Sequence, residues 1–259
     1  MNAMPTRVLL AGESWNTYAI HTKGASAYST AGYEEGADEL IESLRSTGYD
    51  VTYLPNHLVP EQFPYTTEEL RAQYDVVILS DLSADSLLLP NAVFVRGERR
   101  PNRTRSLAEF AARGGGLLMI GGYMSFSGFE GRARYSSTAL AEALPVTMAQ
   151  YDDRIELPEG VNPQVTEVHE ILSGIGQDWP YFLSHNRFVA KESAQVLMTS
   201  GDDPFLVVGE HGCGRVAAFA SDCSPHWGSP EFMAWPYYAK FWSNLVSWLA
   251  RARSENQSA

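Results

Sequence analysis

Polar and aromatic side chains of the kind that line ligand sites follow three short apolar runs, directly after each run ends. Glu13 and Trp15 follow the first run, and Asp81 follows the second. Asp222 and His226 follow a run near the carboxyl end of the chain. Here the histidine could serve as a general base or metal ligand that Asp222 orients, or it could pack in the loop and only fix its shape.

A glycine-flanked turn follows a further apolar run and holds the remaining candidate residues. Gly121 and Gly122 come directly after the run, and Tyr123 and Ser125 follow them. A sharp turn of this kind can expose a nucleophilic serine, or it can bind an oxyanion or carboxylate through its backbone N–H groups. The pattern G-x-S-x-G is absent from the sequence, which favours backbone binding over a nucleophilic Ser125.

The runs that carry these residues alternate with helical patterns over the first half of the chain. Short apolar runs bounded by glycine or polar residues indicate buried strands at 7–12, 51–54, 75–81 and 117–120. Strands that alternate with helices predict a parallel sheet with helices on both faces. Ligands bind outside the carboxyl ends of such strands, so the candidate side chains are expected to meet at one rim of the sheet.

The segments between and after these strands predict other elements. The stretch 15–32 is interpreted as a long polar loop, and a helix is expected over 33–47. Segment 145–209 is interpreted as short antiparallel or edge strands of the same sheet. A hairpin is expected at 205–220, where its first strand overlaps the end of this segment, and a last helix at 235–250. We expect one domain over residues 6–250, with residues 1–5 disordered or derived from a tag and residues 251–259 frayed.

Composition and charge limit the function classes. The 259 residues carry a formal net charge of −12, which opposes binding to nucleic acid and to anionic membrane surfaces. The sequence has no apolar run near the ~20 residues that cross a bilayer. Its two cysteines form no disulfide framework or paired zinc motif, which favours a reducing, cytoplasmic compartment and no metal. Dinucleotide and P-loop glycine motifs are also missing, so we expect no cofactor.

Several segments together resemble an uncharacterised bacterial family with the class I glutamine amidotransferase-like fold. They are residues 114–123, 144–146, 152–154, 214–216 and 221–227. The resemblance implies an α/β, flavodoxin-like three-layer sandwich with a mostly parallel sheet and antiparallel edge strands. It also implies that the elbow after 117–120 would hold the glutaminase cysteine, whereas Gly122 or Tyr123 stands there in this sequence. Trehalose-utilisation-type relatives of the same fold likewise lack that cysteine.

The resulting hypothesis is an amidotransferase-like domain without glutaminase chemistry that binds a small polar ligand, carboxylate or sugar-like, at the strand rim. Its binding residues would be Glu13, Trp15, Asp81, Gly121, Gly122 and Tyr123. One alternative is a hydrolase that uses Ser125, or a water activated by His226 and Asp222. Another is an oligomeric structural or interaction protein, with the aromatic last helix and the arginine-rich segment 96–105 as the subunit contact. A homo-oligomer is expected.

Overall fold

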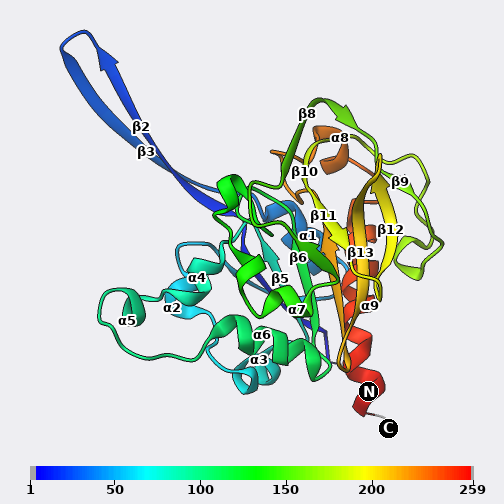
Figure 1. Ribbon diagram of the computed structural model, residues 1–259. Coiled ribbons are helices and arrows are strands. Elements are labelled where there is room, and N and C mark those ends of the chain that lie inside the picture. Colours follow the sequence, from blue (N-terminus) through cyan, green and yellow to red (C-terminus); the bar gives the residue numbers. More distant parts are fainter. Residues whose placement is uncertain (1–3, 258–259) are drawn as a thin grey trace.

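An eight-stranded mixed sheet forms the centre of the computed structural model, which describes residues 4–257 (Figure 1). The strand order is β4-β1-β5-β6-β14-β13-β12-β9. The first five strands in this order are parallel: β4 (Asp50–Leu54), β1 (Arg7–Gly12), β5 (Val76–Ser80), β6 (Gly116–Ile120) and β14 (Gly214–Phe219). The other three continue the sheet in antiparallel pairs: β13 (Asp203–His211), β12 (Gln195–Ser200) and β9 (Gln164–Val165). The predicted mostly parallel sheet with an antiparallel edge is therefore confirmed.

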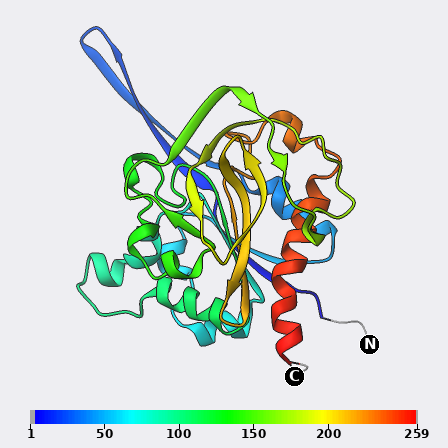
Figure 2. The ribbon, with the colours of Figure 1, turned by 45° about the vertical axis from the view of Figure 1, so that its right-hand side comes forward.

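Helices cover both faces of the sheet and complete three layers (Figure 2). On one face, α9 (Tyr238–Gln257) packs beside α1 (Asp38–Ser46). On the other face, α6 (Arg103–Ala112) contacts β6, β13 and β14, and α3 (Thr67–Gln73) packs against α6. The last helix buries the aromatic and aliphatic residues that the sequence assigned to its inner face, Tyr238, Phe241, Trp242, Leu245, Val246 and Leu249. It extends beyond Ala250, where the sequence pattern placed its end.

Segment 145–209 only partly joins the central sheet. Its β8 (Arg154–Val161) pairs with β10 (Phe182–Asn186), and β7 (Val146–Met148) pairs with β11 (Phe188–Ala190). Each pair is a separate two-stranded sheet, so the expectation that all these strands extend the main sheet was wrong for four of them. The remaining short elements are α2 (Val59–Gln62), α4 (Ala84–Leu88), α5 (Asn91–Phe94), α7 (Leu140–Ala143), α8 (Pro230–Met233) and the 3₁₀ turns Phe129–Gly131, Tyr135–Ser137 and Glu170–Leu172.

A long two-stranded arm stands where the sequence pattern indicated a polar loop. Strand β2 (Ser14–Lys23) pairs with β3 (Ser26–Glu35) over ten residues each, and the arm projects away from the body (Figure 1). The loop interpretation of 15–32 was therefore wrong, and the following helix begins at Asp38 rather than at 33. The alternation of Tyr18, Ile20 and Thr22 with other side chains is the strand signal that the polar composition concealed.

Residues 1–3 and 258–259 lie outside the described part, and with them most of the predicted disordered start and the end of the predicted frayed tail. Within the described part, no helix combines the length and the apolar character that a membrane crossing requires.

Candidate functional site

A cavity of about 410 Å³ opens at the carboxyl ends of β1, β5, β6 and β14. Its walls come from the segments that follow these four strands, including the start of β2. They consist of Glu13, Trp15, Asp81, Tyr123, Met124, Asp222, Pro225 and His226. In the sheet order, β4 and β5 flank β1 on opposite sides, so the connection reverses direction at β1. Parallel α/β sheets bind ligands at such a reversal, and the cavity has the volume of a small-molecule site.

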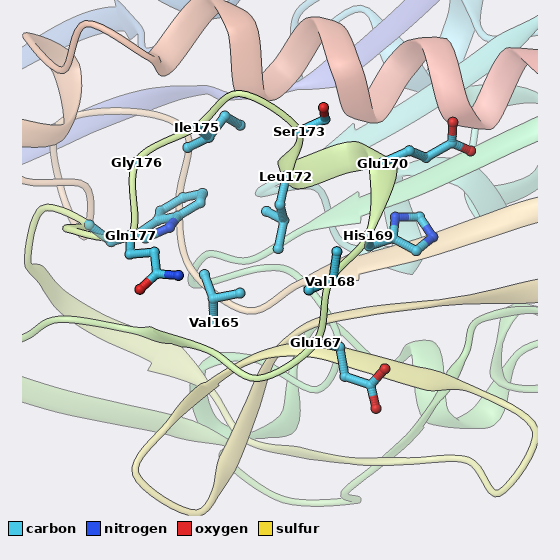
Figure 3. Close-up of a pocket in the computed structure, with 11 residues that line it drawn as sticks. Val165, Glu167, Val168, His169, Glu170, Leu172, Ser173, Ile175, Gly176 and Gln177 are labelled. Carbon is cyan, nitrogen blue, oxygen red and sulfur yellow. The ribbon is translucent and has the colours of Figure 1, made fainter.

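Two other hollows help to define this one. A second cavity of about 320 Å³ adjoins it and shares Trp15, Asp81 and Met124, so that Trp15 stands between the two. A third, of about 280 Å³, lies in the loop region 165–179, away from the strand ends (Figure 3). There the Nδ1 atom of His169 accepts a hydrogen bond from the Ile171 N–H, which caps a 3₁₀ turn. We place the candidate site at the strand ends, where carboxylates and aromatic rings share one cavity.

Glu13 occupies a buried and strained position directly after β1. Its φ angle is 50°, and its side chain is 1% exposed. The hydroxyls of Ser80 and Ser224 donate to the two carboxylate oxygens at 2.5 and 2.8 Å. The preceding Gly12 has φ 114°, and a Cβ there would lie 1.8 Å from the Ser80 carbonyl oxygen. Only glycine therefore allows β1 to pass β5 this closely and turn Glu13 into the cavity.

Asp81 and Asp222 complete a set of three carboxyl groups in the cavity wall. Asp81 also has a positive φ angle, 42°, and its Oδ1 atom accepts a hydrogen bond from the Met124 N–H at 2.6 Å. Asp222 is buried three residues after the end of β14, and its Oδ1 atom accepts from the Ser224 N–H at 3.1 Å. Backbone N–H groups thus fix the direction of both side chains, which keeps the carboxyl groups in place before any ligand arrives.

The three carboxyl groups hold protons more strongly than free carboxylic acids. Burial, followed by the charge of Asp81, raises the pKa of Glu13 to about 7. Burial also raises the pKa of Asp81, and burial with the charges of Glu13 and Asp81 raises the pKa of Asp222 well above its usual range. Like charges in one desolvated site oppose one another's ionisation. Glu13 can therefore both donate and accept a proton near neutral pH.

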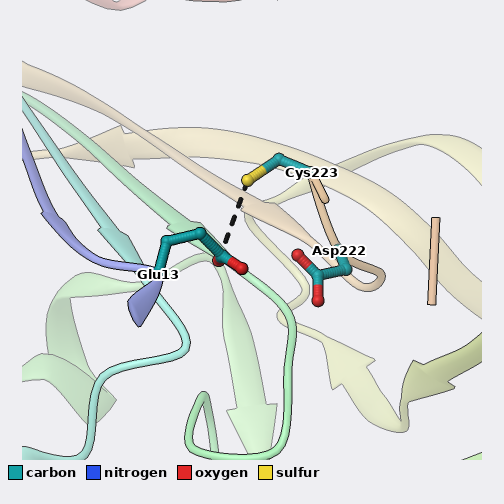
Figure 4. Close-up of side chains that lie close together, drawn as sticks. All are labelled: Glu13, Asp222 and Cys223. Atoms are coloured by element: carbon teal, nitrogen blue, oxygen red, sulfur yellow. Dashed lines mark hydrogen bonds between the residues drawn. The ribbon is translucent and has the colours of Figure 1, made fainter. Parts of the chain in front are cut away.

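Glu13, Asp222 and the buried Cys223 are the described residues whose ligand atoms lie close enough to surround a cation, all within 4.8 Å of one another (Figure 4). The Cys223 thiol lies 3.8 Å from Glu13 Oε2 and 3.6 Å from the Ser80 hydroxyl. Burial and the two neighbouring carboxylates raise the pKa of this thiol. Metal ligands must lose their protons, and the raised pKa values of all three groups oppose that loss. We therefore assign no metal to the set.

Aromatic rings also line the cavity. The ring centroid of Tyr123 lies 4.8 Å from that of His226 and 5.7 Å from that of the buried Trp227. The Arg154 guanidinium stacks over the Tyr123 ring at 4.5 Å and pairs with Asp152 at 2.9 Å. The acidic turn at 152–154 is thus ion-paired, as the sequence indicated, and in addition it holds the tyrosine in place.

Three predicted site residues lie outside the cavity wall. Gly121, Gly122 and Ser125 are buried, and their polar atoms bond within the protein. The Gly121 N–H donates to the Phe219 and Ser221 carbonyls and the Gly122 N–H to Asn186. The Ser125 hydroxyl donates to the Ile120 carbonyl at 2.5 Å and accepts from the Asp81 N–H at 3.1 Å. These groups shape the turn, and their assigned binding and catalytic roles stay predictions.

Sequence reasoning missed two wall residues and the groups that support the carboxylates. Met124 and Pro225 line the cavity beside Tyr123 and His226. Their position after the same strands could have identified them, but neither side chain has an ionisable or strongly hydrogen-bonding group that would mark it as a site residue. Ser80 and Ser224 were visible only as polar residues near strand ends, and their contact with Glu13 depends on side-chain geometry.

Comparison with known proteins agrees with this fold. The family model "Putative glutamine amidotransferase" matches residues 7–251, and the chain belongs to this family. Two solved structures from Salmonella typhimurium, Cytoplasmic Protein STM3548 and Cytoplasmic Protein STM1381, are each 45% identical with a TM-score of 0.91. The matches cover 93% and 94% of this chain and 98% and 99% of the relatives.

More distant structures share the fold alone. A "putative gmp synthase subunit a protein" from Thermoplasma acidophilum is 10% identical over 100% of both chains, with a TM-score of 0.52. Among the curated proteins, none matches the chain significantly. Family and fold are therefore established, and the ligand has to be inferred from the site.

Neither cysteine stands at the elbow where the amidotransferase resemblance would place a nucleophile. Cys223 follows β14 and is buried, and Cys213 lies exposed in the turn between β13 and β14. The elbow after β6 instead carries glycines and Tyr123. The chain thus has the amidotransferase-like fold without a thiol nucleophile at that turn.

Proposed function

We propose that this amidotransferase-like domain binds a small, uncharged, sugar-like ligand in the cavity at the strand ends. The observation that carries the proposal is the composition of the wall, which combines three carboxyl groups with aromatic side chains. Carboxylates accept hydrogen bonds from hydroxyl groups, and aromatic faces pack against the C–H faces of a sugar ring. A polyhydroxy ligand can make both interactions, through its hydroxyl groups and its C–H faces.

The same wall disfavours the carboxylate ligand that the sequence left open. Each of Glu13, Asp81 and Asp222 would repel an anion when it is ionised, and His226 is the one wall residue that can carry a positive charge. The backbone N–H groups of Gly121, Gly122 and Met124, which could bind a carboxylate, already donate to protein oxygens. The adjoining cavity extends the space beyond Trp15, which supports a ligand longer than one ring.

Isothermal titration calorimetry against a panel of neutral mono- and disaccharides, polyols and dicarboxylates tests this proposal. We expect binding of at least one neutral hydroxylated compound, and we expect Glu13→Gln and Asp222→Asn to weaken it. Glu192→Gln, an exposed acid outside the cavity, is the matched control. Binding confined to dicarboxylates, or variants at Glu13 and Asp222 that bind every compound as the wild type does, would contradict the proposal.

A second candidate is a hydrolase that activates water at the same carboxyl groups. The pKa of Glu13, about 7, favours it, because a group with that pKa exchanges protons efficiently at neutral pH. Asp222 and His226, the pair named for this role from the sequence, line the same cavity. Release of reducing ends from a glycoside panel, abolished by Glu13→Gln, would separate hydrolysis from binding alone.

We also propose a cytoplasmic location. The two Salmonella relatives at 45% identity are described as cytoplasmic proteins, and the reducing compartment inferred from the cysteines agrees with this. Cell fractionation with an antibody against the chain tests the location directly.

A further inference from the structure

The arm formed by β2 and β3 pairs with no other strand of the described chain. Its ten cross-strand pairs run from Ser14↔Glu35 to Lys23↔Ser26 without a register shift. All ten residues of β3 are exposed, and β2 is exposed from Asn16 onward except for the partly covered Ala19. Figure 2 shows the arm standing clear of both helical layers.

The two faces of the arm differ in chemistry. Side chains alternate along each strand, so Tyr18 and Ile20 share one face with the opposing Ser29 and Ala31. Both large side chains are 79% exposed. The other face carries Thr17 and Thr30, together with His21 stacked on Tyr28 and the tip residue Lys23. We call the face of Tyr18 and Ile20 the apolar face.

A hairpin of this kind needs a partner surface. Two strands alone are marginally stable in water, because one layer buries little apolar area. Open strand edges and exposed apolar side chains also promote association. At its base, the Tyr33 ring meets His57 edge-on at 5.0 Å, but such support ends near the body. The outer part, with Tyr18 and Ile20, has no comparable contact within the described chain.

Size and charge point to a second copy of this chain as that partner. At about 3.3 Å per residue, ten residues reach about 33 Å, far enough to cross a neighbouring domain. The arm's twenty residues match the 20 to 30 residues that each partner contributes to a standard interface. Between Trp15 and Tyr33, Lys23 is the only fully charged side chain, whereas the whole chain carries −12. The arm can therefore approach an acidic body without repulsion, and its tip lysine is attracted to it.

Part of the surface expected from the sequence is occupied within one chain, although most of segment 96–105 is exposed. Phe241 and Trp242 of the last helix are buried against the sheet. Arg103 of the arginine-rich segment is also fully buried, with its guanidinium over the Tyr65 ring at 3.7 Å. The arm is thus the better candidate for a contact between copies.

We propose that the arm is the self-association surface of this protein. Two copies exchange arms around a two-fold axis, and each lays its apolar face on the body of the other. The arm contact is independent of the proposed ligand. Trp15 is the last residue of β2 that lines the cavity, and the residues of the arm contact lie beyond it.

Sedimentation velocity over about 0.1 to 100 µM tests the proposal on the full chain. We expect the wild type to reach the mass of two chains. A short-arm variant, with residues 17–32 replaced by Asn-Gly, keeps the Asn16↔Tyr33 pair and supplies a two-residue hairpin turn. It should remain at the mass of one shortened chain, which is below the 28.6 kDa of the full chain. Circular dichroism and thermal unfolding check that its body is folded.

Point substitutions test which face makes the contact. Tyr18→Ser with Ile20→Ser should raise the dissociation constant at least about 10-fold. Thr17→Ser with Thr30→Ser, on the opposite face, is the matched control and should leave it unchanged. A wild type that stays monomeric at 100 µM, or a folded short-arm variant that still dimerises, would overturn the proposal. Equal weakening by both pairs would overturn the assignment to the apolar face.

Discussion

The rim of the sheet and the arm begin at neighbouring residues, yet they are built in opposite ways. At Glu13 the side chain is buried and both carboxylate oxygens accept hydrogen bonds from serine hydroxyls. A few residues later, Tyr18 stands 79% exposed on a single layer of two strands. The rim is fixed by contacts within one chain, whereas the arm leaves its contact surface free. Substitutions at the rim should therefore affect folding and ligand binding, and those on the arm should affect association.

The largest difference in folding stability is expected between substitutions of one glycine in each region. Gly12→Ala should destabilise the fold by about 3 to 5 kcal/mol, because the new Cβ overlaps the Ser80 carbonyl and φ is 114°. Gly24→Ala at the arm tip meets nothing within 4 Å and has φ 60°, so the cost should be about 1 kcal/mol. Urea denaturation of both variants measures this contrast. Similar losses at the two positions would show that the arm is as tightly integrated as the rim.

A pH dependence of stability should come from the rim. The pKa of Glu13 is about 7 in the folded chain against 4.5 for the free side chain. Between these values the unfolded state loses its proton first, so the free energy of unfolding falls as pH rises from about 4.5 to 7. The loss should approach about 3 kcal/mol from Glu13 alone, and Asp81 and Asp222 act in the same direction.

Denaturation at a series of pH values checks this slope. Glu13→Gln removes the ionisable group and keeps a side chain of similar shape, so it should flatten the slope. Glu192→Gln, an exposed acid far from the rim in sequence, should keep the wild-type slope. A slope that survives in Glu13→Gln would assign the pH dependence to other groups.

A smaller effect, on ligand affinity, should distinguish Trp15 at the base of strand β2 from Tyr18 further along it. Trp15→Ala removes an aromatic wall from both adjoining cavities and should weaken ligand binding by about 10-fold, or ~1.4 kcal/mol. Tyr18→Ala lies three residues further along the same strand and should leave the affinity unchanged. Calorimetry with a neutral sugar that binds the wild type measures both. Equal losses would place the ligand on the arm or couple the arm to the cavity.

The sequence predicted the rim better than the arm for a physical reason. Buried parallel strands leave continuous apolar runs, and the residues after Ala11, Leu79 and Phe219 had to emerge at one edge of the sheet. Glu13, Asp81 and Asp222 could therefore be grouped without coordinates. An arm with two exposed faces has no buried side to impose a strong apolar pattern, so its strands resembled a polar loop.

Side-chain detail at the rim was beyond the sequence pattern. The Ser125 hydroxyl bonds to backbone groups of Ile120 and Asp81, a contact that depends on the exact path of the turn after β6. The same holds for Arg154, which reaches Tyr123 from a separate two-stranded sheet. Pairing of that sheet depends on contacts between segments far apart in the chain, which local periodicity does not encode.

The most direct test of the central claim is an NMR titration that follows the indole N–H signals of the tryptophans. A neutral sugar should shift the Trp15 signal, assigned through Trp15→Phe, because this ring lines both rim cavities. The signal of Trp179, which lines the distant cavity of loop 165–179, should keep its position. A titration in which Trp179 shifts and Trp15 does not would place the ligand elsewhere and contradict the account.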